Sequence, residues 1–274
     1  MKVLKFGGTS VANSKSLNKV LEIIKNQNDS IVVVVSALAG ITDLLMEMLS
    51  LAESRKDNFK SNLSKIEKLH LEPIKKCIPI QNQSAIISYL KKHLNELESR
   101  LDAIFLLEEV TKKNNASVAS YGEILSSNII HEIFKHNKID SELKDARELI
   151  QTSTHNGIEV VNEKITDQQI KNYFSNNKSR VVIVPGFIAC NKSGVTTTLG
   201  RGGSDYSAAI IANSVEADMF EIWTDVSGIY TAHPKIVTQA KPIKKLSYYE
   251  AMELSHFGAK VIYPPTLQPI IEKN

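Results

Sequence analysis

Two short, fully apolar runs set the strongest limit on how this chain can fold. Residues 31–35 read IVVVV and residues 181–184 read VVIV, and each run stops at turn-forming residues, Ser36 in one case and Pro185-Gly186 in the other. Runs of this kind are typical of parallel strands covered on both faces, because a strand with one wet face alternates apolar and polar residues. The sequence therefore predicts a parallel sheet between layers of helices.

The segments around these runs alternate between strands and helices. Residues 3–6 form a short strand ended by Gly7-Gly8, a helix is expected over 14–25, and another begins after Gly40. This order of strand, turn, helix and strand is the βαβα pattern of an α/β protein. Further strands are expected over 141–145, 195–199 (one arm of a hairpin) and 220–223, and further helices over 121–136, 163–174, 248–254 and 256–262, with 208–212 in another.

The region of about 57–114 differs from the rest. It contains no glycine, is rich in Lys, Glu, Leu and Ser, and carries prolines at positions 73 and 79. We expect a helical hairpin that is broken near these two prolines. A solvated helical insertion is the favoured interpretation, and a lid or an oligomer surface is the alternative.

Composition excludes several classes of function. The chain has 274 residues, of which 42% are hydrophobic and 23% charged, as in ordinary soluble globular proteins. A net charge of +3 without a basic tract argues against nucleic acid, and no apolar stretch reaches the length of a membrane span. Cys77 and Cys190 are far apart and match no metal-binding spacing, and the N-terminus does not resemble a secretory signal. We expect a cytoplasmic enzyme with neither nucleic acid nor membrane as a partner.

The first motif that points to chemistry is KFGGTS at residues 5–10. A strand brings Lys5 to its carboxyl end, and Gly7 and Gly8 leave backbone N–H groups uncovered before a helix. Such N–H groups favour a phosphate, and Lys5 adds a positive charge. The spacing is not that of a Walker A sequence, and a plain tight turn remains the alternative.

A second glycine-rich motif, LGRGGSD, occupies residues 199–205. The guanidinium of Arg201 could bind a carboxylate through two parallel hydrogen bonds. Asp205 is placed either as an active-site acid or as a simple helix cap, and the sequence favours neither.

Weaker signals lie at four other places. Asp225 follows a strand in WTDVSG, where a nucleotide or metal contact and a plain turn are both common. Lys260 could reach phosphates or simply be exposed. Ser36, Thr42 and Asp43 in one segment, and Ser120 to Glu123 in another, could hold a small polar substrate or cap helices.

Taken together and in this order, the motifs resemble the aspartokinase branch of the amino acid kinase family. The matching stretches are KFGGTSV, VVVVSALAGITD, SYGEILSS, TLGRGGSDYSAA, EIWTDVSGIYTAHP and EAMELSHFGAKVIYP. The EIWTDV and EAMELSHFGAKV stretches are similar to those of aspartokinases fused to homoserine dehydrogenase.

The resemblance implies a three-layer α/β/α sandwich with a mainly parallel central sheet, and ATP, Mg²⁺ and L-aspartate as cofactors and substrate. It implies that the phosphates are held by Lys5, Gly7, Gly8 and Ser10, and the rest of the nucleotide by Thr224, Asp225, Tyr230, Lys235 and Lys260. Aspartate would be bound by Ser36, Thr42, Glu123, Arg201 and Ser204. The residues closest to catalysis would be Lys5, Asp205 and Lys260. No metal ligands are assigned.

Three positions depart from the family pattern. The family usually has an acidic residue or proline at Ser227, an aspartate at His233 and an arginine at Lys235. The pattern ends near residue 264, so we expect one kinase domain over 1–274, without the small regulatory domains into which aspartokinases normally continue. Assembly as a homo-oligomer remains open.

Two rival functions also remain open. One is a kinase of the same fold with another acceptor, such as acetylglutamate, glutamate, carbamate or a nucleoside monophosphate. The other is a nucleotide-binding regulatory module without catalysis.

Overall fold

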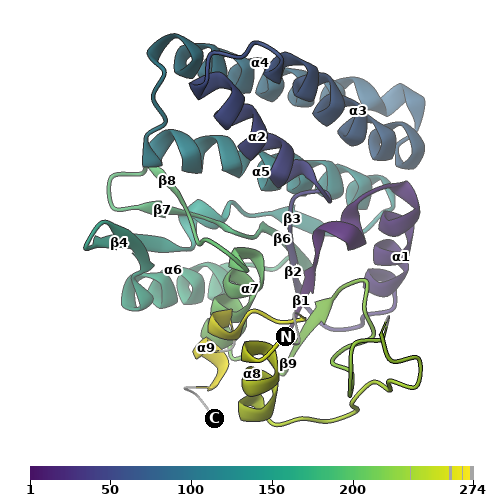
Figure 1. Ribbon diagram of the computed structural model, residues 1–274. Helices are drawn as coiled ribbons and strands as arrows, with labels where there is room; N and C mark the ends of the chain where they lie inside the picture. Colours follow the sequence, from purple (N-terminus) through teal and green to yellow (C-terminus); the bar gives the residue numbers. More distant parts are fainter. Residues whose placement is uncertain (235, 259–260, 267, 272–274) are drawn as a thin grey trace.

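The computed structural model describes residues 1–234, 236–258, 261–266 and 268–271 (Figure 1). Among these residues, the central sheet has five strands in the order β3-β6-β2-β1-β9, and every pair of neighbours is parallel. The strands are β1 (Lys2–Phe6), β2 (Ile31–Val35), β3 (Ser141–Leu143), β6 (Val181–Pro185) and β9 (Met219–Trp223). The predicted parallel sheet is therefore confirmed.

Helices cover both faces of this sheet. One face packs against α1 (Ser14–Lys25), α2 (Ile41–Glu53) and α5 (Lys112–His136), and the other against α6 (Glu163–Asn176) and α7 (Gly203–Ser214). Successive residues of β1 alternate between the two cores: Leu4 and Phe6 belong to the first, and Val3 to the second. Lys5 shares the parity of Val3, so its side chain leaves β1 on the side of α7.

The predicted helical hairpin forms, but it is not a solvated appendage. It consists of α3 (Phe59–Cys77) and α4 (Gln83–Leu107), joined by the short helix η2 (Ile80–Asn82), and it packs on α2 and α5 (Figure 1). Leu90, Leu97 and Leu101 are fully buried and belong to the same hydrophobic core as the sheet. The hairpin is therefore an outer layer of the main core.

One of the two predicted helix breaks is wrong. Pro73 lies inside α3 and is buried, and the helix continues for another turn to Cys77. The break occurs instead at Ile78, whose backbone is extended (φ −116°, ψ 132°) because the following Pro79 disfavours the helical conformation before it. A proline inside a helix removes one backbone donor, yet α3 continues past Pro73.

A second, smaller sheet was only partly predicted. Its order is β5-β4-β7-β8, with β4 (Gln151–His155), β5 (Ile158–Val161), β7 (Ile188–Asn191) and β8 (Thr196–Thr198). The hairpin of β7 and β8 confirms the expectation for residues 195–199. The β4–β5 hairpin was missed. Between β3 and β4 the chain forms the short helix η3 (Ala146–Glu148).

The last part of the chain follows β9 as a long irregular segment and then α8 (Tyr248–His256), η4 (Pro264–Thr266) and α9 (Gln268–Ile271). The helix predicted over 256–262 is not formed at its start, since α8 ends at His256 and Gly258 has a φ of 128°. Within the described parts of the chain, no helix is both long and apolar enough to cross a membrane.

Candidate active site

The carboxyl ends of β1, β2 and β6 open into one cleft of about 680 Å³, which α5 and the start of α7 complete. Ligands of open α/β sheets bind at this edge, where the loops after the strands converge. The cleft contains nine of the predicted site residues: Lys5, Gly8, Ser36, Thr42, Asp43, Glu123, Arg201, Ser204 and Asp205.

Close backbone packing joins the turns that follow β1 and β2. A Cβ atom on Gly8 would lie 2.8 Å from the carbonyl oxygen of Ala37, so only glycine fits there without moving backbone. The N–H of Ala39 donates to the carbonyl of Gly8 (3.2 Å). The N–H of Gly7 donates to the carbonyl of Trp223 (3.1 Å), which ties the same turn to the end of β9. This turn is therefore fixed by its neighbours on both sides.

Lys5 and Asp205 form an ion pair on the wall of the cleft. The distance from Lys5 Nζ to Asp205 Oδ1 is 2.6 Å, and the two side chains are 10% and 16% exposed. Asp205 lies in the first turn of α7, where a carboxylate also interacts favourably with the helix dipole. The N-cap position is Gly202, and no side chain caps this helix, so Asp205 is not a simple N-cap.

Glu123 is the most deeply buried acid of the cleft, with 3% of its surface exposed. Its Oε1 accepts a hydrogen bond from the N–H of Ala37 (3.1 Å), while Oε2 is buried without a hydrogen-bond partner among the described residues. Burial raises the pKa of Glu123 to about 7, although the Ala37 N–H and the charge of Lys5 both oppose this shift. A buried carboxylate oxygen without a partner, placed at a cleft, can accept a hydrogen bond from a cationic group of a ligand.

The helix-capping alternatives for Thr42, Ser120 and Glu123 are wrong. Helix α5 begins at Lys112, nine residues earlier than predicted, so Ser120 and Glu123 lie inside it. Ser120 Oγ donates to the carbonyl of Ser117 within the same helix (2.7 Å). Helix α2 has Gly40 at its N-cap, and no side chain, including that of Thr42, provides a capping hydrogen bond there.

Arg201 lies on the loop between β8 and α7 and is exposed at the cleft. Its guanidinium carbon lies 5.7 Å from the centre of the Tyr263 ring. Beside it, Ser204 packs closely against Gly186 in the turn after β6. A Cβ atom on Gly186 would lie only 2.7 Å from Cβ of Ser204, so this packing requires glycine at position 186. The cleft thus combines two cationic side chains, one ion-paired and one exposed, with a buried carboxylate.

Other residues predicted to contact the nucleotide lie elsewhere. Ser10, Thr224 and Asp225 line a separate hollow of about 400 Å³ between α1 and the end of β9. Ser10 Oγ donates to the carbonyl of Trp223 (3.1 Å), and Thr224 Oγ1 donates to Asp225 Oδ1 (3.1 Å). Tyr230 lines neither hollow, and its backbone pairs with that of Pro242. Lys235 and Lys260 lie outside the described residues.

Several residues of the cleft were missed in the sequence, among them Phe187 and Thr198. Phe187 has a left-handed backbone conformation with a φ of 67°. Phe187 directly follows the Pro185-Gly186 turn that ends β6. The rule that ligands bind beyond the carboxyl ends of parallel strands could have identified it.

The described residues contain no group of three or more His, Cys, Asp or Glu side chains that could hold a metal ion by themselves. Mg²⁺ rarely needs such a group, since it is usually held by one or two carboxylates together with phosphates of the substrate. Asp205, next to Lys5 in the cleft, is a carboxylate of this kind. The donor set is therefore compatible with a metal that arrives bound to a nucleotide.

Known proteins are similar to this chain over almost its whole length. The bifunctional aspartokinase/homoserine dehydrogenase of Buchnera aphidicola is 36% identical over 278 residues, which cover 99% of this chain and 34% of that protein. Lysine-sensitive aspartokinase 3 of Escherichia coli is 34% identical over 282 residues, covering 99% of this chain and 59% of that protein. The chain thus spans less than two thirds of the length of these relatives.

A solved structure shows the same fold. The crystal structure of E. coli aspartokinase III in complex with aspartate and ADP superposes with a TM-score of 0.89 at 31% identity, covering 99% of this chain and 60% of that one. This match confirms the predicted α/β architecture with its mainly parallel sheet. The model of the amino acid kinase family matches residues 1–274, the whole chain. The chain therefore belongs to the amino acid kinase family.

Proposed function

We propose that this chain is an aspartate kinase domain, which transfers the γ-phosphate of ATP to the β-carboxylate of L-aspartate and forms 4-phospho-L-aspartate. The observation that carries the proposal is the composition of the cleft: a buried carboxylate with an unpaired oxygen, an exposed arginine and a buried lysine face the same space. The crystal structure of E. coli aspartokinase III, the similar protein described above, contains aspartate and ADP.

L-Aspartate matches the charges of this cleft. The guanidinium of Arg201 suits the α-carboxylate, because it offers parallel N–H donors. The unpaired Oε2 of Glu123 suits the ammonium group, which would supply the missing donor. The β-carboxylate is then the group left to meet the phosphate near Lys5.

The nucleophile in this reaction needs no general base. A carboxylate is already ionised at neutral pH, so the protein has to align the reactants and neutralise charge. Lys5 is held on the cleft wall by Asp205, and its ammonium can stabilise negative charge on the transferring phosphoryl group. Mg²⁺, when bound with the nucleotide, supplies further charge neutralisation on the phosphates.

We also propose a metabolic pathway and a cellular compartment for this activity. The phosphorylation of aspartate would be an early step of amino-acid biosynthesis in the cytoplasm, leading toward lysine, threonine and methionine. No nucleic acid or membrane is needed for it.

The substrate assignment is tested by measuring ADP formation with a panel of acceptors: L-aspartate, L-glutamate, N-acetyl-L-glutamate, carbamate and UMP, each with ATP and Mg²⁺. We expect L-aspartate to give the highest kcat/KM. A higher value with any other acceptor would contradict the assignment. ATP binding without ADP formation, under all these conditions, would favour the regulatory module instead.

A further inference from the structure

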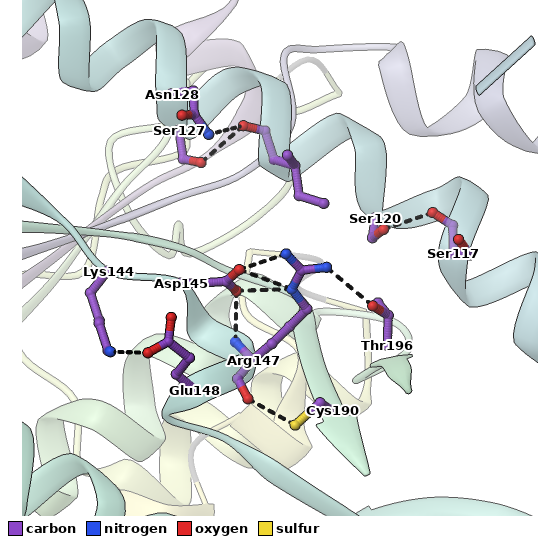
Figure 2. A network of polar contacts seen from close by, with 11 residues as sticks. Ser117, Ser120, Ser127, Asn128, Lys144, Asp145, Arg147, Glu148, Cys190 and Thr196 are labelled. Carbon is purple, nitrogen blue, oxygen red and sulfur yellow. Dashed lines mark hydrogen bonds and ion pairs between the residues drawn. The ribbon is translucent and has the colours of Figure 1, made fainter. Parts of the chain in front are cut away.

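A second polar cavity, of about 460 Å³, lies on the other side of α5 from the candidate active site. It is enclosed by α4, α5, the segment around η3 and the start of β8, and none of its lining residues lines the catalytic cleft. Figure 2 shows the polar side chains around it. The proposed kinase reaction uses none of them.

Arg147 forms one wall of this cavity and is held in a fixed orientation. Its Nε donates to both carboxylate oxygens of Asp145 (3.0 Å each), its Nη2 donates to Oδ2 of Asp145 (2.6 Å), and its Nη1 donates to Oγ1 of Thr196 (3.2 Å). Because each terminal nitrogen carries two N–H groups, one on each has no partner among the described residues. Figure 2 shows this end of the guanidinium directed toward helix α5, which carries Ser120, Ser127 and Asn128.

A second arginine reaches the cavity from α4. Arg100 Nε donates to the hydroxyl of Tyr121 (3.2 Å), and no carboxylate among the described residues forms an ion pair with it. By contrast, the acidic residue Glu148 is already paired with Lys144. Asp145 is likewise engaged by Arg147. Two cationic side chains of the lining can therefore bind a ligand. Arg100 has no ion-pair partner among the described residues, and Arg147 has one N–H group without a partner there on each terminal nitrogen.

The hydroxyl groups of α5 add acceptors to this wall. Ser120 and Ser127 donate their own protons to backbone carbonyls of the helix, so their oxygens keep free lone pairs. Ile124, Leu143 and Pro185 provide a small apolar surface next to them. This combination suits a compact organic molecule better than an inorganic ion.

We propose that this cavity is a binding site for a small organic carboxylate. Two guanidinium groups favour a carboxylate because their N–H donors match its two oxygens. Glu96, Asp145 and Glu148 line the same space and repel an anion in proportion to its charge, so a polyphosphate, which carries more negative charge, fits less well than a small carboxylate. The volume lies within the range of about 300–1,000 Å³ that is usual for small-molecule sites.

The test is a binding measurement by calorimetry and by ligand-detected NMR, with acetate, malonate, succinate and glutarate as probes. Succinamide is the control ligand, because it has the length of succinate without its charge. Four variants are compared: Arg147→Gln, Arg100→Gln, Arg201→Gln in the catalytic cleft, and Arg55→Gln. Arg55 pairs with Glu108 on the surface and lines neither cavity, so it controls for the loss of one positive charge.

We expect at least one of the dicarboxylates to bind and succinamide not to bind. Loss of the guanidinium in Arg147→Gln or Arg100→Gln is expected to weaken this binding roughly tenfold or more, the size of a lost charge-assisted hydrogen bond. Arg201→Gln and Arg55→Gln should leave it unchanged. Arg100 is exposed, so its variant stays informative if Arg147→Gln does not fold.

Three results would overturn the proposal. The first is the absence of saturable binding for every carboxylate at millimolar concentration. The second is binding that Arg201→Gln abolishes while Arg100→Gln and Arg147→Gln do not, which would assign it to the catalytic cleft. The third is equal binding of succinate and succinamide.

Discussion

Lys5 Nζ and Asp205 Oδ1 lie 2.6 Å apart, although the two residues are far apart in the sequence. Lys5 belongs to the first strand, β1, and Asp205 to α7, the helix that precedes the last strand of the sheet. The alternation of β1 directs Lys5 toward α7, and the first turn of α7 places Asp205 opposite it. Both side chains are largely buried, so each needs the other to compensate for lost hydration. The pair therefore fixes a positive charge on the wall of the cleft, where the proposed function has the phosphate transferred.

Replacement of Lys5 by alanine should chiefly lower kcat. If Lys5 acts as one preorganised donor to the transferring phosphoryl group, we expect a loss of about 100- to 1000-fold, with little change in the KM for aspartate. Steady-state kinetics would measure both constants. Lys15→Ala, at an exposed position of α1, is the matched control and should behave as the unaltered protein. A normal kcat in Lys5→Ala would remove Lys5 from the catalytic account.

Replacement of Arg201 by alanine should act mainly on aspartate binding. The loss of charge-assisted hydrogen bonds, worth roughly 1.5–3 kcal/mol, is expected to raise the KM for aspartate by about tenfold or more. Arg201→Lys keeps the charge without the planar fork and should restore only part of the affinity. An unchanged KM in Arg201→Ala, together with a raised KM in Lys5→Ala, would mean that the two subsites are reversed.

Glu123 should make the use of aspartate depend on pH. Burial raises the pKa of this carboxyl to about 7, so in the free protein it is neutral below that pH and charged above it. Only the charged form pairs with an ammonium group, and kcat/KM for aspartate should therefore fall as the pH decreases through about 7. In Glu123→Gln this decrease should disappear, and kcat/KM should be low at every pH. A profile for Glu123→Gln that still falls through pH 7 would assign the titration to another group.

His70 should make the helical layer sensitive to acid. It is fully buried in α3, its Nδ1 lies 2.8 Å from the carbonyl oxygen of Ile66, and burial lowers its pKa to about 4. Between this value and its ordinary value of 6.5, the unfolded chain binds a proton that the folded protein does not, so the free energy of unfolding should decrease as the pH falls from 6.5 toward 4. The decrease attributable to His70 is on the order of 3 kcal/mol.

Urea unfolding at several pH values would measure this effect. His70→Leu should show a smaller decrease between pH 6.5 and 4 than the unaltered protein. His155→Gln, which changes an exposed histidine, should show the same decrease as the unaltered protein. Equal pH profiles for His70→Leu and the unaltered protein would show that His70 does not titrate in this way.

The elements predicted best are those with strong local signals. The strands β2 and β6 are apolar runs, β1 and β9 are largely apolar, and each is followed by turn residues; the structure has all four in one parallel sheet. The β4–β5 hairpin was missed because its sequence is polar and half-exposed, with few of the apolar alternations that identify a strand. Similarly, the first turns of α5 contain Lys112 to Asn115, which give no apolar period.

The candidate site was predicted as a set of residues and not as a geometry. The motifs identified Lys5, Glu123, Arg201 and Asp205, but nothing local indicates which of them meet. The ion pair of Lys5 with Asp205 and the hydrogen bond from Ala37 to Glu123 depend on the strand order and on how α5 and α7 pack on the sheet. Sequence periodicity carries no information about these long-range contacts.

The central claim, that this chain phosphorylates the side-chain carboxylate of aspartate, is tested most directly by identifying the product. The reaction with ATP, Mg²⁺ and L-aspartate is run in the presence of hydroxylamine, which traps an acyl phosphate as a hydroxamate, and the trapped compound is analysed by mass spectrometry. We predict the β-hydroxamate of aspartate, formed only when ATP is present and greatly reduced in Lys5→Ala. Formation of ADP without any aspartyl hydroxamate, or a larger yield of the glutamate hydroxamate under the same conditions, would contradict the claim.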